Sequence, residues 1–242
     1  MSAPIYAIGD IHGQIHGLEV VLERIAADGG SEAEIVFLGD YTDRGPDSRA
    51  VVQRLIDGVD AGRPWHVLRG NHDRMFCRFV AEGVLHDDRI LSGRGWLDPA
   101  LGGATTLASY GVEADQAGDI MEILEATRSA VPDRHIAFLA DRDLTLERDG
   151  KLFVHAGVRP GVTLQDQHED DLVWIREPFL SHTDAHPWLI VHGHTALDHP
   201  SHFGNRIDLD GGAGYGRPLH AAVFEGTEAW VLTEAGRAPL RP

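Results

Sequence analysis

The sequence is poor in features that would each have indicated a class of protein. Cys77 is the only cysteine, so neither an intramolecular disulfide nor a cysteine-rich zinc site can form. No apolar stretch approaches the ~20 residues that a membrane-spanning helix needs, so we expect no membrane association. The N-terminus lacks a basic segment followed by an apolar one, and we therefore expect no signal peptide and a cytoplasmic location.

Basic residues are also scarce. Lys and Arg total 21 against 38 Asp and Glu, which gives a formal net charge of −17. Phosphate backbones attract Lys and Arg, so this balance argues against nucleic acid as a partner. The hydrophobic content of 43% is instead typical of a chain with a buried core. Because no linker or repeat interrupts the sequence, we predict a single domain over residues 1–242.

Three polar clusters stand out, because each directly follows a short run of branched and aromatic residues. The runs, at 5–8, 35–38 and 65–68, have the composition of buried strands. The clusters are Gly9-Asp10-Ile11-His12-Gly13, Gly39-Asp40-Tyr41-Thr42-Asp43-Arg44-Gly45 and Arg69-Gly70-Asn71-His72-Asp73. Apolar residues at helical spacing follow the first two clusters. This strand–loop–helix order predicts a parallel sheet whose three clusters meet at one edge.

The second half of the chain predicts a second sheet. Two strands joined by Asp149-Gly150 form a favourable hairpin, and a further strand at 189–192 follows. We expect three short strands to complete a second, more antiparallel sheet: 206–209, 219–225 and 229–233. Residues 116–140 predict two helices, broken at Pro132. Residues 85–112 and 159–188 predict irregular structure, the first as a cap over the site.

Two histidines complete a possible metal site. His155 and His194 also follow strands, in the segments His155-Ala156-Gly157 and Gly193-His194-Thr195. Imidazole and carboxylate together favour manganese, iron or zinc over calcium. Asp40, from the middle strand, is the natural bridge between two ions ~3.5–4 Å apart, which would lower the pKa of a shared water.

Each motif alone has a simpler interpretation. Gly-Asp-x-His-Gly is compatible with a polar turn, Asn71 with a helix cap, and a single histidine with a hydrogen-bonded core residue. Five such segments, each at a strand end, favour the metal site.

Together these motifs resemble those of the phosphoprotein phosphatase family within the calcineurin-like metallophosphoesterases. The three clusters match its signature motifs, and the two histidine segments resemble its downstream motifs. The similarity covers residues 5 to about 220 and is greatest to the bacterial and phage branch, in which Asp73 replaces a Glu. The resemblance implies an α/β (α+β) fold in which two packed mixed sheets form a central β-sandwich flanked by helices. A dinuclear metal site would lie at the sheet edge.

The resemblance also implies a role for each polar residue. The metal ligands would be Asp10 and His12 for the first ion, Asp40 as the bridge, and Asn71, His155 and His194 for the second. We expect two divalent ions, manganese first, with iron or zinc as alternatives. His72 would protonate the leaving oxygen, oriented by Asp43. The phosphate would be held by Arg44 with Asn71 and His72, and by Arg176 as a second arginine, preferred over Arg94, Arg159 and Arg217.

The resemblance favours a metal-dependent phosphomonoesterase, first as a bacterial Ser/Thr protein phosphatase. A metal-bridging hydroxide would attack phosphorus in line, on a phosphorylated protein or a small phosphoester. The alternative is a symmetrical bis(5′-nucleosyl)-tetraphosphatase, which shares these motifs. A non-catalytic phosphate-binding relative is disfavoured because every ligand, acid and arginine position is retained. The sequence does not indicate an oligomeric state.

Overall fold

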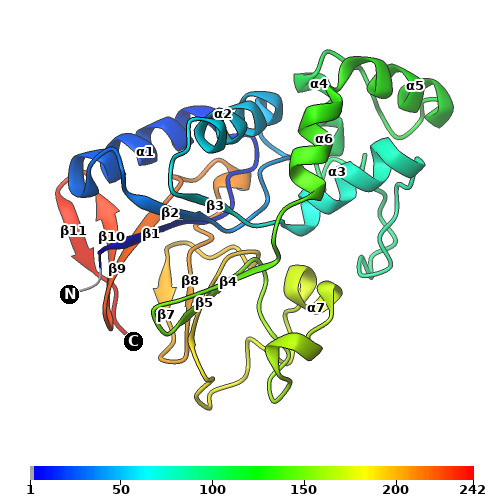
Figure 1. Cartoon of the computed structure of the whole chain (residues 1–242). Helices are drawn as coiled ribbons and strands as arrows, with labels where there is room; N and C mark the ends of the chain where they lie inside the picture. The colour runs from blue at the N-terminus through cyan, green and yellow to red at the C-terminus, as the bar shows by residue number, and fades with distance from the viewer. Residues whose placement is uncertain (1–2) are drawn as a thin grey trace.

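The computed structural model describes residues 3–242, which form two β-sheets packed face to face (Figure 1). The first sheet has the strand order β11-β10-β9-β1-β2-β3 and the second the order β4-β5-β6-β8-β7. The strands are β1 (Ile5–Ile8), β2 (Glu34–Phe37), β3 (Trp65–Val67), β4 (Thr145–Arg148), β5 (Lys151–Val154), β6 (Leu189–His192), β7 (Ser201–His202), β8 (Arg206–Asp208), β9 (Ala221–Glu225), β10 (Glu228–Thr233) and β11 (Gly236–Pro239). The helices are α1 (Ile15–Gly29), α2 (Ser48–Asp60), α3 (Asn71–Glu82), α4 (Gly103–Ser109), α5 (Ile120–Ala130), α6 (Asp133–Ala140) and α7 (Glu169–Trp174). Within residues 3–242, no helix is long and apolar enough to cross a membrane.

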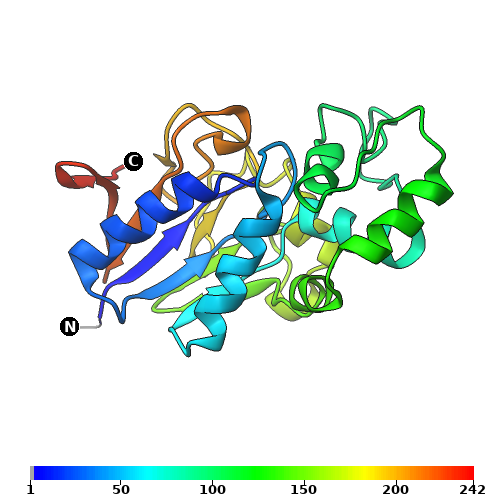
Figure 2. The same ribbon diagram turned by 90° about the horizontal axis from the view of Figure 1, so that it is seen from above.

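The central strands β1 and β2 of the first sheet are apolar on both faces because both faces are covered. Alternate side chains of β1 point to opposite sides, so Tyr6 and Ile8 belong to the core beneath helices α1 and α2. Ile5 and Ala7 belong instead to the core between the two sheets, with Phe153 of β5. Figure 2 shows α1 and α2 lying across the helical face of the first sheet. This layering confirms the predicted β-sandwich flanked by helices.

The parallel arrangement of β1, β2 and β3 is also confirmed, with Ile5 opposite Glu34 and Ile35 opposite Trp65. These strands end toward helices α3–α6, which lie beyond the sheet in Figure 1. The three polar clusters therefore emerge at one end of the sheet, as the strand order predicts.

The expected placement is wrong for two of the three C-terminal strands. β9 and β10 belong to the first sheet, where β9 pairs antiparallel with β1. Of the three strands expected in the second sheet, only β8 lies there, between β6 and β7, and it runs parallel to β6. Without β9, the buried strand β1 would be an edge with unpaired backbone groups in the middle of the protein. The apolar composition of β9 fits this central position.

The two segments expected to be irregular each contain a short helix. Helix α4 lies within residues 85–112 and α7 within residues 159–188. α7 is six residues long and begins with three acidic residues, so it has too few apolar positions to show helical periodicity. It packs on the outer face of the second sheet, where Leu172 contributes to a third core cluster.

Candidate metal centre and phosphate pocket

The residues predicted as metal ligands come from five loops that follow strands. Asp10 and His12 follow β1, and Asp40 follows β2. The remaining three are Asn71 at the start of α3 after β3, His155 directly after β5, and His194 after β6. All six side chains are buried. The two sheets thus contribute to one centre, because the ends of their parallel strands lie close together.

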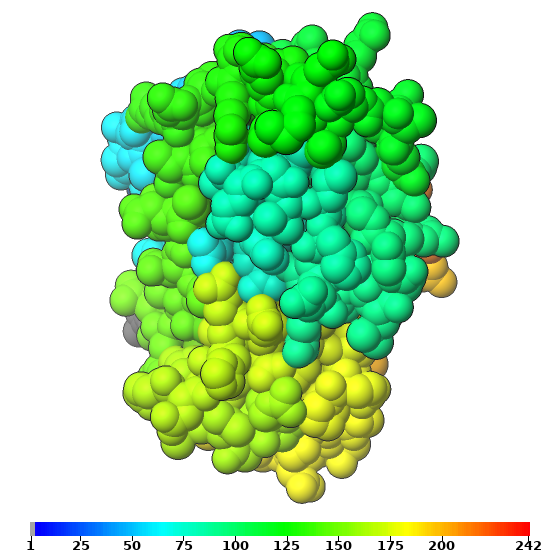
Figure 3. All heavy atoms as spheres, turned by 90° about the vertical axis from the view of Figure 1, so that its right-hand side faces the viewer, coloured from blue at the N-terminus to red at the C-terminus, as the bar shows by residue number. Residues whose placement is uncertain are grey.

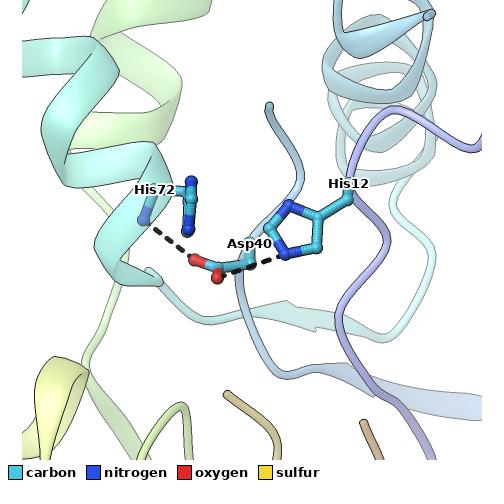
Figure 4. A group of neighbouring side chains, drawn as sticks. All are labelled: His12, Asp40 and His72. Atoms are coloured by element: carbon cyan, nitrogen blue, oxygen red, sulfur yellow. Dashed lines mark hydrogen bonds and ion pairs between the residues drawn. The ribbon is translucent and has the colours of Figure 1, made fainter. Parts of the chain in front are cut away.

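Asp40 lies between two groups of histidines. Its Oδ2 is 3.6 Å from Nε2 of His12, and its Oδ1 is 3.4 Å from Nε2 of His155. Asp10 Oδ2 lies 4.0 Å from the same His12 nitrogen. Figure 4 shows Asp40 between His12 and the N-terminus of α3, where the backbone N–H of His72 donates to Oδ1. Each oxygen of this carboxylate therefore faces a different imidazole, which is the arrangement a bridging ligand requires.

Asn71 lies among the remaining histidines. Its Oδ1 is 2.9 Å from Nε2 of His155 and 2.9 Å from Nδ1 of His194. The cap of α3 is Gly70, so capping does not account for Asn71. Nε2 of His194 is buried and has no hydrogen-bond partner among residues 3–242.

Backbone carbonyls fix the tautomers of two of these rings. Nδ1 of His12 lies 2.7 Å from the carbonyl oxygen of Thr42, and Nδ1 of His155 lies 2.9 Å from that of Leu38. A carbonyl can only accept, so each Nδ1 carries the proton and each Nε2 directs a lone pair into the centre. Lone pairs of imidazole, carboxylate and amide groups thus converge, and this donor set fits first-row divalent metals.

Burial changes the protonation of the whole group. Burial and the neighbouring Asp210 raise the pKa of Asp10, while burial and Asp73 raise that of Asp40. Burial also lowers the pKa of His155 to about 3 and that of His194 well below its usual range, so both rings are neutral. Neutral imidazoles and crowded buried carboxylates suit the binding of positive ions. Two candidate ion-binding groups within the described residues share Asp40: His12, Asp40 and His72, and Asp40, His155 and His194.

The backbone of the centre is strained. Six described residues other than glycine have positive φ, and five of them belong to the predicted site. They are His12 (46°), Asp40 (55°), Asp43 (74°), Arg44 (66°) and His194 (67°). Such conformations persist only where surrounding structure enforces them, and they concentrate at functional sites.

Glycines in the motifs allow close approach to the ligands. A Cβ on Gly70 would lie 2.1 Å from Oδ1 of Asp40, and a Cβ on Gly193 would lie 2.1 Å from Oδ1 of Asp10. Both positions thus require the smallest residue, irrespective of the backbone conformation.

His72 and Arg44 lie beside the metal ligands. Nδ1 of His72 is 2.6 Å from Oδ2 of Asp43, which leaves Nε2 directed at the centre. Arg44 reaches both histidines, with Nη1 2.6 Å from His12 Nε2 and Nη2 3.1 Å from His72 Nε2. Burial raises the pKa of Asp43 to about 7. The hydrogen bonds from Thr106 and Trp96 lower this pKa, but the effect of burial is larger.

A pocket of about 330 Å³ opens over the centre. Its walls include Arg44 and the predicted Arg176, together with Arg89, Leu91 and Tyr215. The alternative arginines do not line it: Arg94, Arg159 and Arg217 instead pair with Asp98, Asp171 and Asp198.

The predicted cap contributes to this pocket. Arg89 and Leu91 come from the segment 85–112, which in Figure 3 lies directly above the yellow-green surface of residues around α7. An ion pair between Arg89 and Asp171 joins these two surfaces, and Arg74 of α3 pairs with Asp170 beside it. The sequence did not predict a role for Arg89 or Tyr215, because no residue type or spacing around them points to substrate binding.

Comparisons with known proteins identify the family. A family model described as calcineurin-like phosphoesterase matches residues 3–214. A symmetrical bis(5′-nucleosyl)-tetraphosphatase of Ralstonia nicotianae is 33% identical over 68% of this chain, and the match spans 46% of that protein. An asymmetrical bis(5′-nucleosyl)-tetraphosphatase of Anoxybacillus flavithermus is 25% identical over 90% of this chain and 89% of its own.

A solved structure shares the fold at low identity. The cold-active protein-tyrosine phosphatase of a psychrophilic Shewanella species superposes with a TM-score of 0.66 and 18% identity, over 100% of this chain and 81% of that one. The chain belongs to the calcineurin-like phosphoesterase family and is a hydrolase that acts on phosphate esters.

Proposed function

We propose that this chain is a two-metal phosphoesterase whose substrate is a dinucleoside tetraphosphate. Asp10, His12 and Asp40 would hold one ion, and Asp40 with Asn71, His155 and His194 the other. When bound, such ions polarise phosphoryl oxygens and lower the pKa of water. Manganese is the first candidate, because the donor set combines imidazole with carboxylate and amide oxygen.

The remaining site residues act on the substrate itself. Arg44 and Arg176 offer guanidinium groups that bind phosphate oxygens in pairs. In hydrolysis, the oxygen of water forms a bond to phosphorus while the bond from phosphorus to the leaving oxygen breaks. In its imidazolium form, His72 gives the proton on Nε2 to that leaving oxygen, and the proton lost by the attacking water passes to the solvent.

The residues that line the pocket determine which substrate the site prefers. We assign Arg44 and Arg176 to one phosphate group, and Arg89 adds a third guanidinium to the same pocket. Tyr215 is 62% exposed and Leu91 is 97% exposed, and both lie at this pocket. Three guanidinium groups beside two exposed apolar surfaces suit a chain of phosphates that carries nucleobases.

A Ser/Thr protein phosphatase, the first choice from sequence, is the second candidate. The net charge of −17 favours basic peptides over polyanions, so it supports this alternative. The two candidates differ in what Arg89 does. With a dinucleoside tetraphosphate, Arg89 would bind a further phosphate of the chain, whereas a phosphoserine peptide has no second phosphate for Arg89 to bind.

An assay with manganese would compare diadenosine tetraphosphate, a phosphoserine peptide and p-nitrophenyl phosphate. We expect the highest kcat/KM for the tetraphosphate. Arg89→Ala should raise its KM by about tenfold, the value of one hydrogen bond to a charged group, and leave p-nitrophenyl phosphate unaffected. Arg159→Ala is the matched control, because Arg159 binds the same Asp171 without lining the pocket. Preference for the peptide, with no effect of Arg89→Ala, would reject the tetraphosphate.

Two further expectations stay predictions. They are a cytoplasmic location and a single domain over residues 1–242.

A further inference from the structure

We infer that Trp96 and Thr106 are positioning residues that hold the Asp43 carboxylate so that His72 presents Nε2 to the leaving group. This inference rests on the proposed role of His72 as the proton donor. Neither residue belongs to a motif that indicates metal or phosphate chemistry. Both come from the segment 85–112, which the sequence predicts only as an irregular cap over the site.

The carboxylate of Asp43 is held at both oxygens. Trp96 donates through Nε1 to Oδ2 at 2.8 Å, and Thr106 donates through Oγ1 to Oδ1 at 2.7 Å. The backbone N–H of Asp43 donates back to the Thr106 hydroxyl, also at 2.7 Å. His72 shares Oδ2 with the indole, at 2.6 Å. Asp43, Trp96 and Thr106 are fully buried, so water cannot replace these bonds.

Packing holds the indole in place. The Trp96 ring contacts Phe76 and Phe79, with ring centroids 5.6 and 5.0 Å apart. Both phenylalanines lie on α3, the helix whose first turn carries His72. A Cβ on Gly103, the first residue of α4, would lie 2.4 Å from the Trp96 ring, so the backbone closes tightly around it. One rigid unit therefore carries the proton donor and the groups that fix its partner.

The chemical consequence follows from the geometry. A carboxylate with a donor on each oxygen cannot rotate about its Cβ–Cγ bond without losing a buried hydrogen bond. Its Oδ2 then fixes the plane of the His72 ring through Nδ1. The direction of Nε2 is set in turn, and small errors in such alignment are costly for proton transfer.

Two conservative variants test this inference. Trp96→Phe keeps the stacked ring and removes the N–H, whereas Thr106→Val removes the hydroxyl at nearly constant volume. Thr106→Ser retains the hydroxyl, and Thr105→Val is the control on the same helix, since its hydroxyl bonds only to the Gly102 carbonyl. The substrates are phenyl phosphate and p-nitrophenyl phosphate with manganese, because phenolate is the more basic leaving group.

We expect Trp96→Phe and Thr106→Val to lower kcat for phenyl phosphate by about tenfold, as for one lost bond to a charged group, with KM unchanged. Turnover of p-nitrophenyl phosphate should change little. Thr106→Ser should restore the wild-type value. A second readout is the ¹⁵N NMR spectrum of histidine-labelled, metal-free protein. There the Nδ1–H signal of His72, assigned with His72→Asn, should weaken in the two variants.

Equal losses on both substrates, or an unchanged His72 signal, would overturn the inference and leave a structural role. His72→Asn separates this outcome from failure of the proposed mechanism. If His72→Asn itself shows no dependence on the leaving group, the role of His72 is wrong. If the effect of His72→Asn depends on the leaving group but the Trp96 and Thr106 variants match wild type, only the positioning role is wrong. Should Thr106→Val fail to fold, Trp96→Phe decides alone.

Discussion

Asp43 accepts a hydrogen bond from Nδ1 of His72 at 2.6 Å, and both side chains are buried beside the metal centre. The proton on Nδ1 leaves Nε2 as the nitrogen that faces the pocket. A carboxylate in this position also stabilises the charged imidazole, which is the form that donates a proton.

This relationship predicts that the effect of His72→Asn depends on the leaving group. The variant should lower kcat for a phosphoserine peptide by roughly 10²–10⁴-fold, because a serine alkoxide is strongly basic and needs the proton. Hydrolysis of p-nitrophenyl phosphate should fall far less, since p-nitrophenolate leaves without one. Metal content, measured by mass spectrometry, should stay unchanged. Equal losses on both substrates would assign His72 to phosphate binding or structure.

Asp40→Asn should remove more metal than any other single substitution in the centre. The reason is that Asp40 faces histidines of both ion groups, whereas His12→Ala or Asn71→Ala affects one. A neutral amide also cannot offset two dications as a shared carboxylate does. Elemental analysis after dialysis against manganese would measure the metal content of each variant. Asp141→Asn is the control, because the Asp141 side chain is 92% exposed. Retention of both ions in Asp40→Asn would show that the carboxylate does not bridge.

Gly70→Ala should disrupt the centre through volume alone. The new methyl group would meet Oδ1 of Asp40 at 2.1 Å and its backbone nitrogen at 2.4 Å. We expect a loss of about 1–3 kcal/mol in the free energy of unfolding, together with lower metal content. Thermal melting and metal analysis would report both effects. Gly17→Ala on α1, whose Cβ would lie 3.4 Å from Leu219, should be tolerated. Normal metal binding by Gly70→Ala would contradict the packing argument.

His192 should make the metal-free protein less stable in acid. Burial lowers the pKa of this fully buried ring to about 3, whereas an unfolded histidine titrates at about 6.5. Between these values the unfolded chain binds a proton that the folded chain does not, so the free energy of unfolding falls as pH decreases from about 6.5 toward 3. His192→Gln should reduce this slope. Denaturant unfolding of the metal-free proteins would be measured at about pH 4, inside this window, and at about pH 7, above it. Identical slopes in the two proteins would refute this account.

The sequence predicted the elements whose signals are local. Strand ends with glycine, acid and histidine are recognisable because composition and spacing lie within a few residues, and these positions do converge in the structure. The partner of β9 was not predictable, since pairing with β1 joins distant parts of the chain and an apolar strand does not encode its neighbour. Trp96 and Thr106 were missed for the same reason. Their bonds to Asp43 span 53 and 63 positions, and tryptophan and threonine are ordinary core residues.

The left-handed backbone at His12, Asp40, Asp43, Arg44 and His194 has a consequence for laboratory evolution. Each such residue costs on the order of 1 kcal/mol relative to glycine, which adopts this conformation freely. Replacement by glycine at any of these five positions would relieve strain while removing a side chain to which we assign metal binding, phosphate binding or the orientation of His72. Selection for heat resistance alone should therefore enrich inactive chains at these positions. Thermostable variants that still turn over substrate must gain their stability elsewhere in the fold.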